Sequence, residues 1–320
     1  MYLLPNFLRG INVNNKENLL DELRKRATLQ LETTLEKSGT SISKVKLDLP
    51  LNKRKIIARK INTYIGKKLY NDYLPSCKSI DDKLMLAYCI DIVMLEYRQK
   101  VWSYEYMTFA RRIGELWEPF CKIPINNTLK PNVSLYTPIS FSDVKETIRE
   151  KSKHYFTTLP ITSVQKKQLA ALYDEIWSFI DSEAINLSLD QHVKVVENGR
   201  TTYYDIDYKS GFSSNEKGNT NRLLQVASIY KSLPEKHQPL LFVRQPEAEN
   251  NHYAKRLKDS GLWEASFGLD TYKKIEELSG FPLRTWMNEY MDWANDITDE
   301  FREYLLSGTD KDLMDKYLTW

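Results

Sequence analysis

Four charged residues in one predicted hairpin have the types and spacing needed to hydrolyse a phosphodiester. Asp205, Asp207 and Lys209 alternate in the stretch TTYYDIDYKSG and therefore share one face of a strand. Asp190 lies 17 residues before Asp207, and a turn at Asn198-Gly199 brings it beside Asp207 on the neighbouring strand. Two carboxylates that converge beside a lysine suit a hard divalent cation such as Mg²⁺. The ammonium is then placed to hold or deprotonate the attacking water.

The alternative interpretation is an exposed edge strand whose polar face meets water. The D-x-K triplet by itself is weak evidence, because it also occurs at residues 81–83 and 143–145. Both of those triplets lie in segments with a helical pattern, where side chains two residues apart do not face each other. The triplet at 207–209 lies on a predicted strand, where the same spacing aims both charged groups at one point.

The elements that must position these residues change type along the chain. Helical patterns cover residues 16–39, 53–74, 79–100, 104–122, 140–156 and 163–184, with a polar loop at 126–138. Two extended runs then flank the Asn-Gly turn, followed by a helix at 219–233 and an apolar strand at 238–245. A helix at 247–261, a short strand at 262–268 and a mostly helical segment at 269–306 complete the chain. From 163 to 245 the predicted order is helix, hairpin, charged strand, helix, strand.

Composition excludes several classes of protein. The 320 residues suffice for one large domain or two ordinary ones, and the net charge of +3 is compatible with a nucleic-acid partner. Three cysteines without paired spacing indicate neither a disulfide framework nor a zinc site. No glycine-rich nucleotide motif is present. The longest apolar stretch, 84–95, is too short to span a bilayer and contains Asp91, so we expect no membrane association.

The hairpin set resembles the signature of the PD-(D/E)XK nuclease superfamily over about residues 163–245. Leu189 stands where the motif has proline, and Asp207 stands where glutamate is commoner. Within this superfamily the chain most resembles the type II restriction endonucleases of prokaryotes. The resemblance implies an α/β fold with a restriction endonuclease-like mixed central sheet flanked by many helices. We expect a helical, partly basic N-terminal region over residues 1–100 and a nuclease domain over residues 101–320.

The resemblance also implies an activity and the residues that carry it. We expect a cytoplasmic hydrolase that cleaves double-stranded DNA at a specific sequence with Mg²⁺ and leaves 5′-phosphates. Asp190 and Asp207 would bind Mg²⁺, and Lys209 would position the attacking water. The family implies the backbone carbonyl of Tyr208 as a further ligand, and a helical glutamate, here Glu115, as another carboxylate. Asp205 remains an alternative to Asp207 as the ligand.

Three groups of residues are predicted to contact DNA. The polar loop and helix start after the charged strand would lie beside the scissile phosphate. The end of the apolar strand carries an arginine and a glutamine, the side chains suited to bidentate contacts with base edges. The basic run 53–68 could neutralise phosphates. The predicted residues are Ser213, Asn215, Lys217, Asn219, Arg222, Arg244, Gln245, Lys53, Arg54, Arg59 and Lys60.

One active site per chain predicts a homodimer. The strands of DNA are antiparallel, so two copies related by a two-fold axis cut both strands of a palindromic site most simply. Two other functions stay open. One is a structure-specific repair, recombination or mobile-element nuclease of the same superfamily. The other is a non-catalytic DNA-binding protein, in which residues 201–209 are only a polar strand.

Overall fold

The computed structural model describes residues 16–178, 185–212, 216–307, 316–318 and 320. The chain divides into two compact units: unit 1 comprises residues 1–130 and 268–320, and unit 2 comprises residues 131–267. The predicted boundary between residues 100 and 101 therefore lies inside unit 1. It falls at the end of a helix that terminates at Val101. The C-terminal segment returns to the first unit, which local sequence patterns did not indicate.

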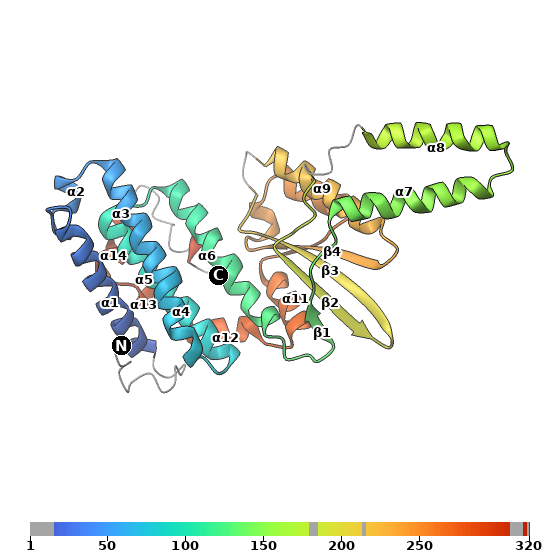
Figure 1. Ribbon diagram of the computed structural model, residues 1–320. Helices are drawn as coiled ribbons and strands as arrows, with labels where there is room; N and C mark the ends of the chain where they lie inside the picture. The colour runs from blue at the N-terminus through green and yellow to red at the C-terminus, as the bar shows by residue number, and fades with distance from the viewer. Residues whose placement is uncertain (1–15, 179–184, 213–215, 308–315, 319) are drawn as a thin grey trace. The chain divides into compact units, whose positions relative to one another are not determined.

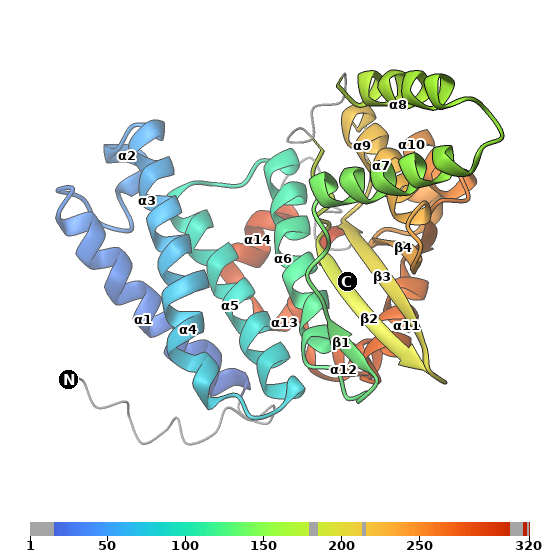
Figure 2. The same cartoon turned by 45° about the vertical axis from the view of Figure 1, so that its right-hand side comes forward.

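Unit 1 is helical throughout its described residues. The elements are α1 (Lys16–Glu36), α2 (Val45–Asp48), α3 (Leu51–Thr63), the π-helix η3 (Tyr64–Leu69), α4 (Tyr70–Tyr73), the 3₁₀ helix η4 (Leu74–Ser76), α5 (Ile80–Val101), α6 (Tyr106–Asn126), α11 (Leu269–Ser279), α12 (Leu283–Tyr290), α13 (Trp293–Asp296) and α14 (Asp299–Ser307). The longest helix of unit 1, α5, packs against α1, α3 and α6, and Figure 2 shows these helices side by side. Among the described residues, no helix combines the length and the apolar character needed to cross a membrane.

The central helix α5 explains how unit 1 is held together. Ser79 and Asp82 form a reciprocal capping box at its start, so the chain enters the helix with its first N–H groups satisfied. Apart from residues 81–83 and 100, its side chains are buried, as expected for a helix that is apolar on all sides. Glu96 is a charged residue among these buried side chains, and Arg24 of α1 neutralises it through two hydrogen bonds of 3.0 and 2.7 Å. The helix predicted over residues 79–100 is confirmed.

Unit 2 contains a mixed five-stranded sheet in the order β1-β2-β3-β4-β5. The first three strands pair antiparallel, whereas β3, β4 and β5 pair in parallel. In Figure 1 the helical hairpin of α7 and α8 is drawn in green beside the sheet strands. The elements are β1 (Val133–Leu135), α7 (Phe141–Thr158), α8 (Ser163–Ser178), β2 (Gln191–Glu197), β3 (Arg200–Lys209), α9 (Lys217–Lys231), β4 (Lys236–Val243), the 3₁₀ helix η5 (Glu247–Glu249), α10 (His252–Asp259) and β5 (Glu264–Phe267).

The predicted hairpin is confirmed in its turn and its register. Asn198 and Gly199 both have positive φ, 49° and 74°, which a two-residue turn of the I′ type requires. Pairing starts at Glu197↔Arg200 and runs to Gln191↔Ile206. The order of helix, hairpin, helix and strand predicted from residue 163 onward is therefore present as α8, β2–β3, α9 and β4. The last residues of the predicted helix, 179–184, lie outside the described residues.

Helix α9 packs on the sheet and builds the core of unit 2. Its apolar side chains Leu223, Val226 and Ala227 join Leu241 and Val243 of β4 in one buried cluster. Strand β1 was missed, because its three residues lie in the segment predicted as a polar loop. The two other D-x-K triplets fall inside α5 and α7, as predicted, and not on strands. The structure is thus an α/β fold with a five-stranded mixed sheet and many helices.

Candidate active site

Asp207 lies where β3 extends beyond the end of its pairing with β2. Pairing with β2 ends at Ile206, whereas β4 continues beside Asp207 and Lys209. Only 1 % of Asp207 is exposed. Lys209 Nζ lies 2.9 Å from its Oδ2, and Arg222 Nη2 of α9 lies 3.5 Å from its Oδ1. The sheet and α9 therefore bury a carboxylate between two cations.

The charge of Asp207 is incompletely compensated. Its Oδ2 is buried. The Lys209 ammonium forms a 2.9 Å ion pair with this oxygen. Burial raises the pKa of Asp207 to about 6; Asp190 adds to this rise, while Lys209 opposes it. A buried carboxylate whose charge is incompletely compensated is suited to accept an added cation.

Lys209 remains a cation at neutral pH. Burial by itself lowers the pKa of an ammonium group. Asp207, and then Asp190, outweigh that effect and raise the pKa of Lys209 above its ordinary value. Of the two roles expected for this lysine, holding the water therefore fits better than deprotonating it.

Asp190 reaches the same place from the start of β2. It is half-buried and directly precedes the strand, and its Oδ2 accepts a 2.8 Å hydrogen bond from the Tyr208 backbone N–H. Because β2 begins one residue later, the carboxylate takes the place that a further strand residue would occupy. The N–H and C=O of a strand residue point to the same side, so the Tyr208 carbonyl also faces Asp190. The predicted convergence of Asp190 and Asp207 is present.

Asp205 has the opposite environment on the same face. It is fully buried and accepts hydrogen bonds from His192 Nδ1 and His237 Nδ1, each 2.8 Å long, and from the Tyr136 hydroxyl. Burial alone would raise the pKa of Asp205, but these donors together lower it. The carboxylate has no need of a cation. This environment favours Asp207 over Asp205 as the metal ligand.

The network around Asp205 extends to Asp190. His192 Nε2 accepts a 3.0 Å hydrogen bond from the Leu189 N–H, so its Nδ1 carries the proton given to Asp205. Leu189 directly precedes Asp190 in the chain. Asp205 and His192 therefore fix the backbone from which Asp190 projects. The sequence offered a signal for His192, which pairs with Asp205 once the hairpin register is known. It offered none for Tyr136 or His237.

The donor set fits Mg²⁺. Among the described residues no group of three or more His, Cys, Asp or Glu side chains is placed to hold a metal ion. Mg²⁺, however, binds through one or two carboxylates and keeps several waters. The carboxylates of Asp190 and Asp207 and the backbone carbonyl of Tyr208 are oxygen donors of the kind that Mg²⁺ requires.

Glu115 lies on α6 in unit 1, away in sequence from the hairpin. Its carboxylate forms ion pairs with Arg111 and Arg112, at 2.9 and 3.1 Å, on its own helix. The structure thus gives Glu115 two partners within unit 1. Its participation in the metal site remains a prediction.

The residues predicted to contact DNA occupy different environments. Ser213 and Asn215 lie outside the described residues. Lys217, Asn219 and Arg222 lie in the first part of α9, where Asn219 donates to Glu216 and Arg222 approaches Asp207.

The predicted base-contacting pair follows β4. Arg244 is only 5 % exposed, and its Nε donates a 3.0 Å hydrogen bond to Ser210 Oγ. Gln245 is half-buried and lies against Gly211, where an added Cβ would be 1.6 Å from its Oε1. Contact of this pair with DNA remains a prediction.

The basic residues of α3 remain available for DNA. Lys53, Arg59 and Lys60 are exposed, and Arg54 is half-buried. All four lie in unit 1, so their relation to the candidate site is a prediction.

Comparison of the chain with protein-family models, with curated protein sequences and with solved structures gives no significant match. The fold and the site themselves define a class of protein. It is an α/β protein whose mixed sheet carries two carboxylates and a lysine at the end of the central strand.

Proposed function

We propose that this chain is a Mg²⁺-dependent nuclease of the PD-(D/E)XK type, and that it acts as a type II restriction endonuclease on double-stranded DNA. The observation that carries the proposal is the environment of Asp207. This carboxylate is buried beside Asp190, its Oδ2 pairs with Lys209 at 2.9 Å, and burial raises its pKa to about 6. A purely structural aspartate would be satisfied in the way that Asp205 is.

Each residue of the site has a distinct task in this proposal. Asp190 and Asp207 hold the cation together with the Tyr208 carbonyl. Mg²⁺ bound there would stabilise negative charge on the reacting phosphate and favour ionisation of a nearby water. The Lys209 ammonium orients the attacking water and stabilises charge that develops on the phosphoryl oxygens. Attack at phosphorus in line with the 3′ oxygen breaks the P–O3′ bond, so the products carry a 5′-phosphate and a 3′-hydroxyl.

An exposed apolar stripe supports the homodimer part of the proposal. Helix α8 buries none of its side chains fully, and Val164, Leu172 and Ile176 are 64, 60 and 59 % exposed. Their spacing of eight and four residues places them on one side of the helix. Several exposed apolar side chains on one side of a helix are typical of an interaction site. Two copies joined through α8 would present two active sites to the two strands of DNA.

Digestion of a long DNA of known sequence tests the activity. With Mg²⁺ we expect discrete fragments whose mapped ends share one short sequence and carry 5′-phosphates, and with a chelator we expect none. Fragmentation only at branched or nicked DNA would favour the repair or recombination alternative. DNA binding that needs no metal and never leads to cleavage would contradict the nuclease assignment.

Leu172→Glu tests the dimer. It should turn concerted cleavage of both strands into nicking, and light scattering of the DNA complex should show one copy of the chain. Glu175→Gln, an exposed change on the same helix, is the control and should cut both strands as the wild type does. A monomeric wild-type complex that cuts both strands concertedly would refute the homodimer, but not the proposed nuclease activity.

A further inference from the structure

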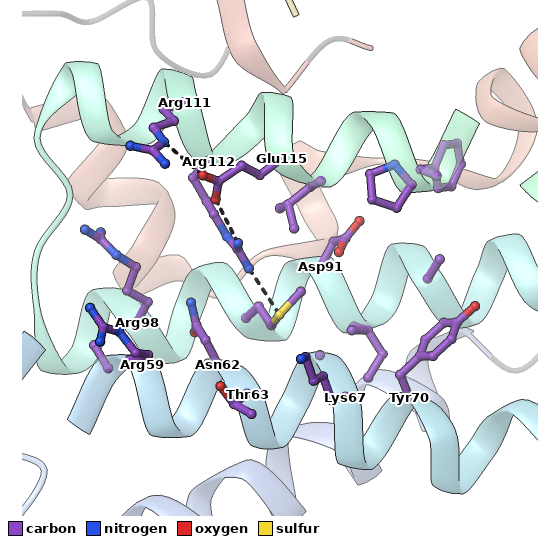
Figure 3. A pocket seen from close by; sticks show the side chains of 18 of the residues that line it. Arg59, Asn62, Thr63, Lys67, Tyr70, Asp91, Arg98, Arg111, Arg112 and Glu115 are labelled. Carbon is purple, nitrogen blue, oxygen red and sulfur yellow. Dashed lines mark hydrogen bonds and ion pairs between the residues drawn. The ribbon is translucent and has the colours of Figure 1, made fainter. Parts of the chain in front are cut away.

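Unit 1 contains a cavity of about 940 Å³ between α3, η3, α5 and α6 (Figure 3). This volume lies in the range of cavities that take cofactors and other small ligands, about 300–1,000 Å³. All of its lining belongs to unit 1, whereas Asp190, Asp207 and Lys209 belong to unit 2. The inference below therefore stands independently of the proposed nuclease activity.

The lining is strongly cationic. Six basic side chains from α3, η3, α5 and α6 line the cavity together with two carboxylates, Asp91 and Glu115. Figure 3 shows Arg59, Arg98 and Arg111 toward one end of the cavity, each from a different helix. Like charges gathered in a concave space create a positive potential that attracts anions. The basic side chains are Lys55, Arg59, Lys67, Arg98, Arg111 and Arg112.

Arg98 is the clearest sign of a missing anion. It is 5 % exposed, and its guanidinium lies 4.1 Å from the Trp102 ring centroid and 3.6 Å from that of Tyr104. Its Nη1 and Nη2 are buried and form no ion pair among the described residues, and the polar side chain that interacts with them is that of Tyr104. Guanidinium groups stay charged in proteins, and a buried charge without a partner is costly. The aromatic rings pack on the faces of the Arg98 guanidinium. Its N–H edge, which is the part of a guanidinium that binds phosphate in bidentate geometry, is not used by these contacts.

Arg112 is also incompletely paired. Its Nη1 reaches Glu115 Oε2 at 3.1 Å, but its Nη2 is directed at Met94 Sδ, 3.3 Å away, and thioether sulfur is a weak acceptor. Its Nε is buried and has no acceptor among the described residues. Arg98 of α5 and Arg112 of α6 thus each have buried guanidinium N–H groups that form no ion pair at this cavity.

The remainder of the lining indicates what else the ligand contains. Ile90, Leu116 and Phe120 provide apolar surface, which an inorganic anion would not need. Asn62 Oδ1 is buried without a hydrogen-bond donor among the described residues, so the ligand should bring a donor of its own. Burial raises the pKa of Asp91 well above its usual range, which favours the neutral carboxyl over the anion.

The backbone beside the cavity is unusual too. α3 continues as the π-helix η3, and π-helical turns are frequently found at functional sites. Gly66 of this turn packs so closely on α5 that an added Cβ would lie 2.6 Å from Met94 Sδ. A larger side chain at this position would displace the Met94 side chain, and Lys67 of the same turn lines the cavity.

We propose that this cavity binds a free nucleoside phosphate, with Arg98 and Arg112 on the phosphate and with Asn62 and the apolar lining on the base. Phosphate supplies anionic acceptors for the N–H groups of both arginines that form no ion pair. The base supplies N–H donors for Asn62 and a flat surface for the apolar wall. A nucleotide within a DNA strand offers the same chemistry, so the test must separate the two sources.

Isothermal titration of the full chain with AMP, ATP, adenosine, inorganic phosphate and a short single-stranded oligonucleotide tests the proposal. AMP or ATP should bind at least about tenfold more tightly than adenosine or phosphate, as expected when one charged hydrogen bond to each arginine is gained. Inorganic phosphate binding as tightly as AMP would overturn the nucleoside part. Binding of the oligonucleotide alone would overturn the assignment to a free nucleotide, and no binding by any probe would overturn the site.

Variants locate the binding within the cavity. Arg98→Met and Arg112→Met should each weaken AMP or ATP binding at least about tenfold. If Arg98→Met fails to fold, Arg112→Met and Asn62→Ala still test the lining. Lys25→Met removes an exposed cation of α1 outside the cavity and should bind as the wild type does. Asp207→Asn should also keep full nucleotide affinity, which separates this site from the proposed nuclease site. Equal binding by the cavity variants and the wild type would refute the proposal.

Discussion

Asp205 and Asp207 are the same residue type, two positions apart, buried on the same face of β3, yet they have opposite environments. Asp205 accepts from two histidines and a tyrosine, and its pKa is lowered. Asp207 is buried with Lys209 beside it, and its pKa is raised to about 6. The strand therefore carries a carboxylate that its neighbours satisfy beside one whose burial disfavours its charge. Burial of charge is compensated at the first and incompletely compensated at the second, as is typical of functional sites.

The largest expected difference is in cleavage. Asp207→Ala and Asp190→Ala should each reduce the Mg²⁺-dependent cleavage rate by about 1,000-fold or more, because each removes charge that holds the cation. Asp205→Ala, assayed where it is still folded, should do less. Rates on a mapped DNA fragment measure this. If Asp205 proved essential and Asp207 dispensable, the two roles would have to be exchanged.

Stability should change in the reverse order. Asp205→Ala leaves two buried histidines and a tyrosine without their acceptor and should lower the free energy of unfolding by about 3–5 kcal/mol. Asp207→Asn removes a buried charge whose burial raises its pKa to about 6, and it should raise the free energy of unfolding by about 1–3 kcal/mol. Denaturant unfolding followed by a probe in unit 2 measures both. An Asp207→Asn variant less stable than the wild type would show that this carboxylate is already satisfied.

His192 links the two environments, and its replacement should have an intermediate effect. His192→Phe keeps the ring but removes the bonds to Asp205 and to the Leu189 N–H. Because Asp190 would lose its backbone support, Mg²⁺ affinity and cleavage should fall about 10–100-fold, as is usual for residues that orient metal ligands. His154→Phe, on α7, is the matched control. Unchanged cleavage by His192→Phe would disprove the positioning role.

The smallest expected effect is on pH dependence. The raised pKa of Asp207 means that the folded state binds a proton more readily than the unfolded state. The destabilisation caused by the buried Asp207 charge should therefore diminish as pH falls from neutral toward about pH 5. The lowered pKa of Asp205 acts oppositely: its contribution is present above the ordinary pKa and is lost only in stronger acid. The stability gap between Asp207→Asn and the wild type should therefore narrow on mild acidification. Cleavage at limiting Mg²⁺ should fall over the same interval, and a constant gap would contradict the raised pKa.

Much of the site was predictable because it depends on local patterns. The Asn-Gly turn fixes the register of the hairpin, and that register places Asp190 beside residue 208 and His192 opposite Asp205. The alternation of a strand then fixes which side chains share a face. These are short-range constraints that a single sequence contains.

The rest depends on contacts between distant segments. Tyr136 reaches Asp205 only because β1 pairs with β2, and His237 does so because β4 lies beside β3. The burial of Arg244 follows from the same strand packing, which a terminal Arg-Gln pair in the sequence does not reveal. Nor does any local pattern indicate that residues 268–320 join unit 1. These features are set by contacts between segments that are distant in the sequence, so local patterns do not contain them.

Cleavage by Lys209→Ala tests the central claim most directly. The ammonium acts on water and on the phosphate, not on recognition, so the variant should bind the mapped DNA site with nearly wild-type affinity. Under saturating DNA and Mg²⁺ we expect its cleavage rate to fall by about 1,000-fold or more. Full cleavage by Lys209→Ala under these conditions would contradict the assignment of the active site to the end of β3.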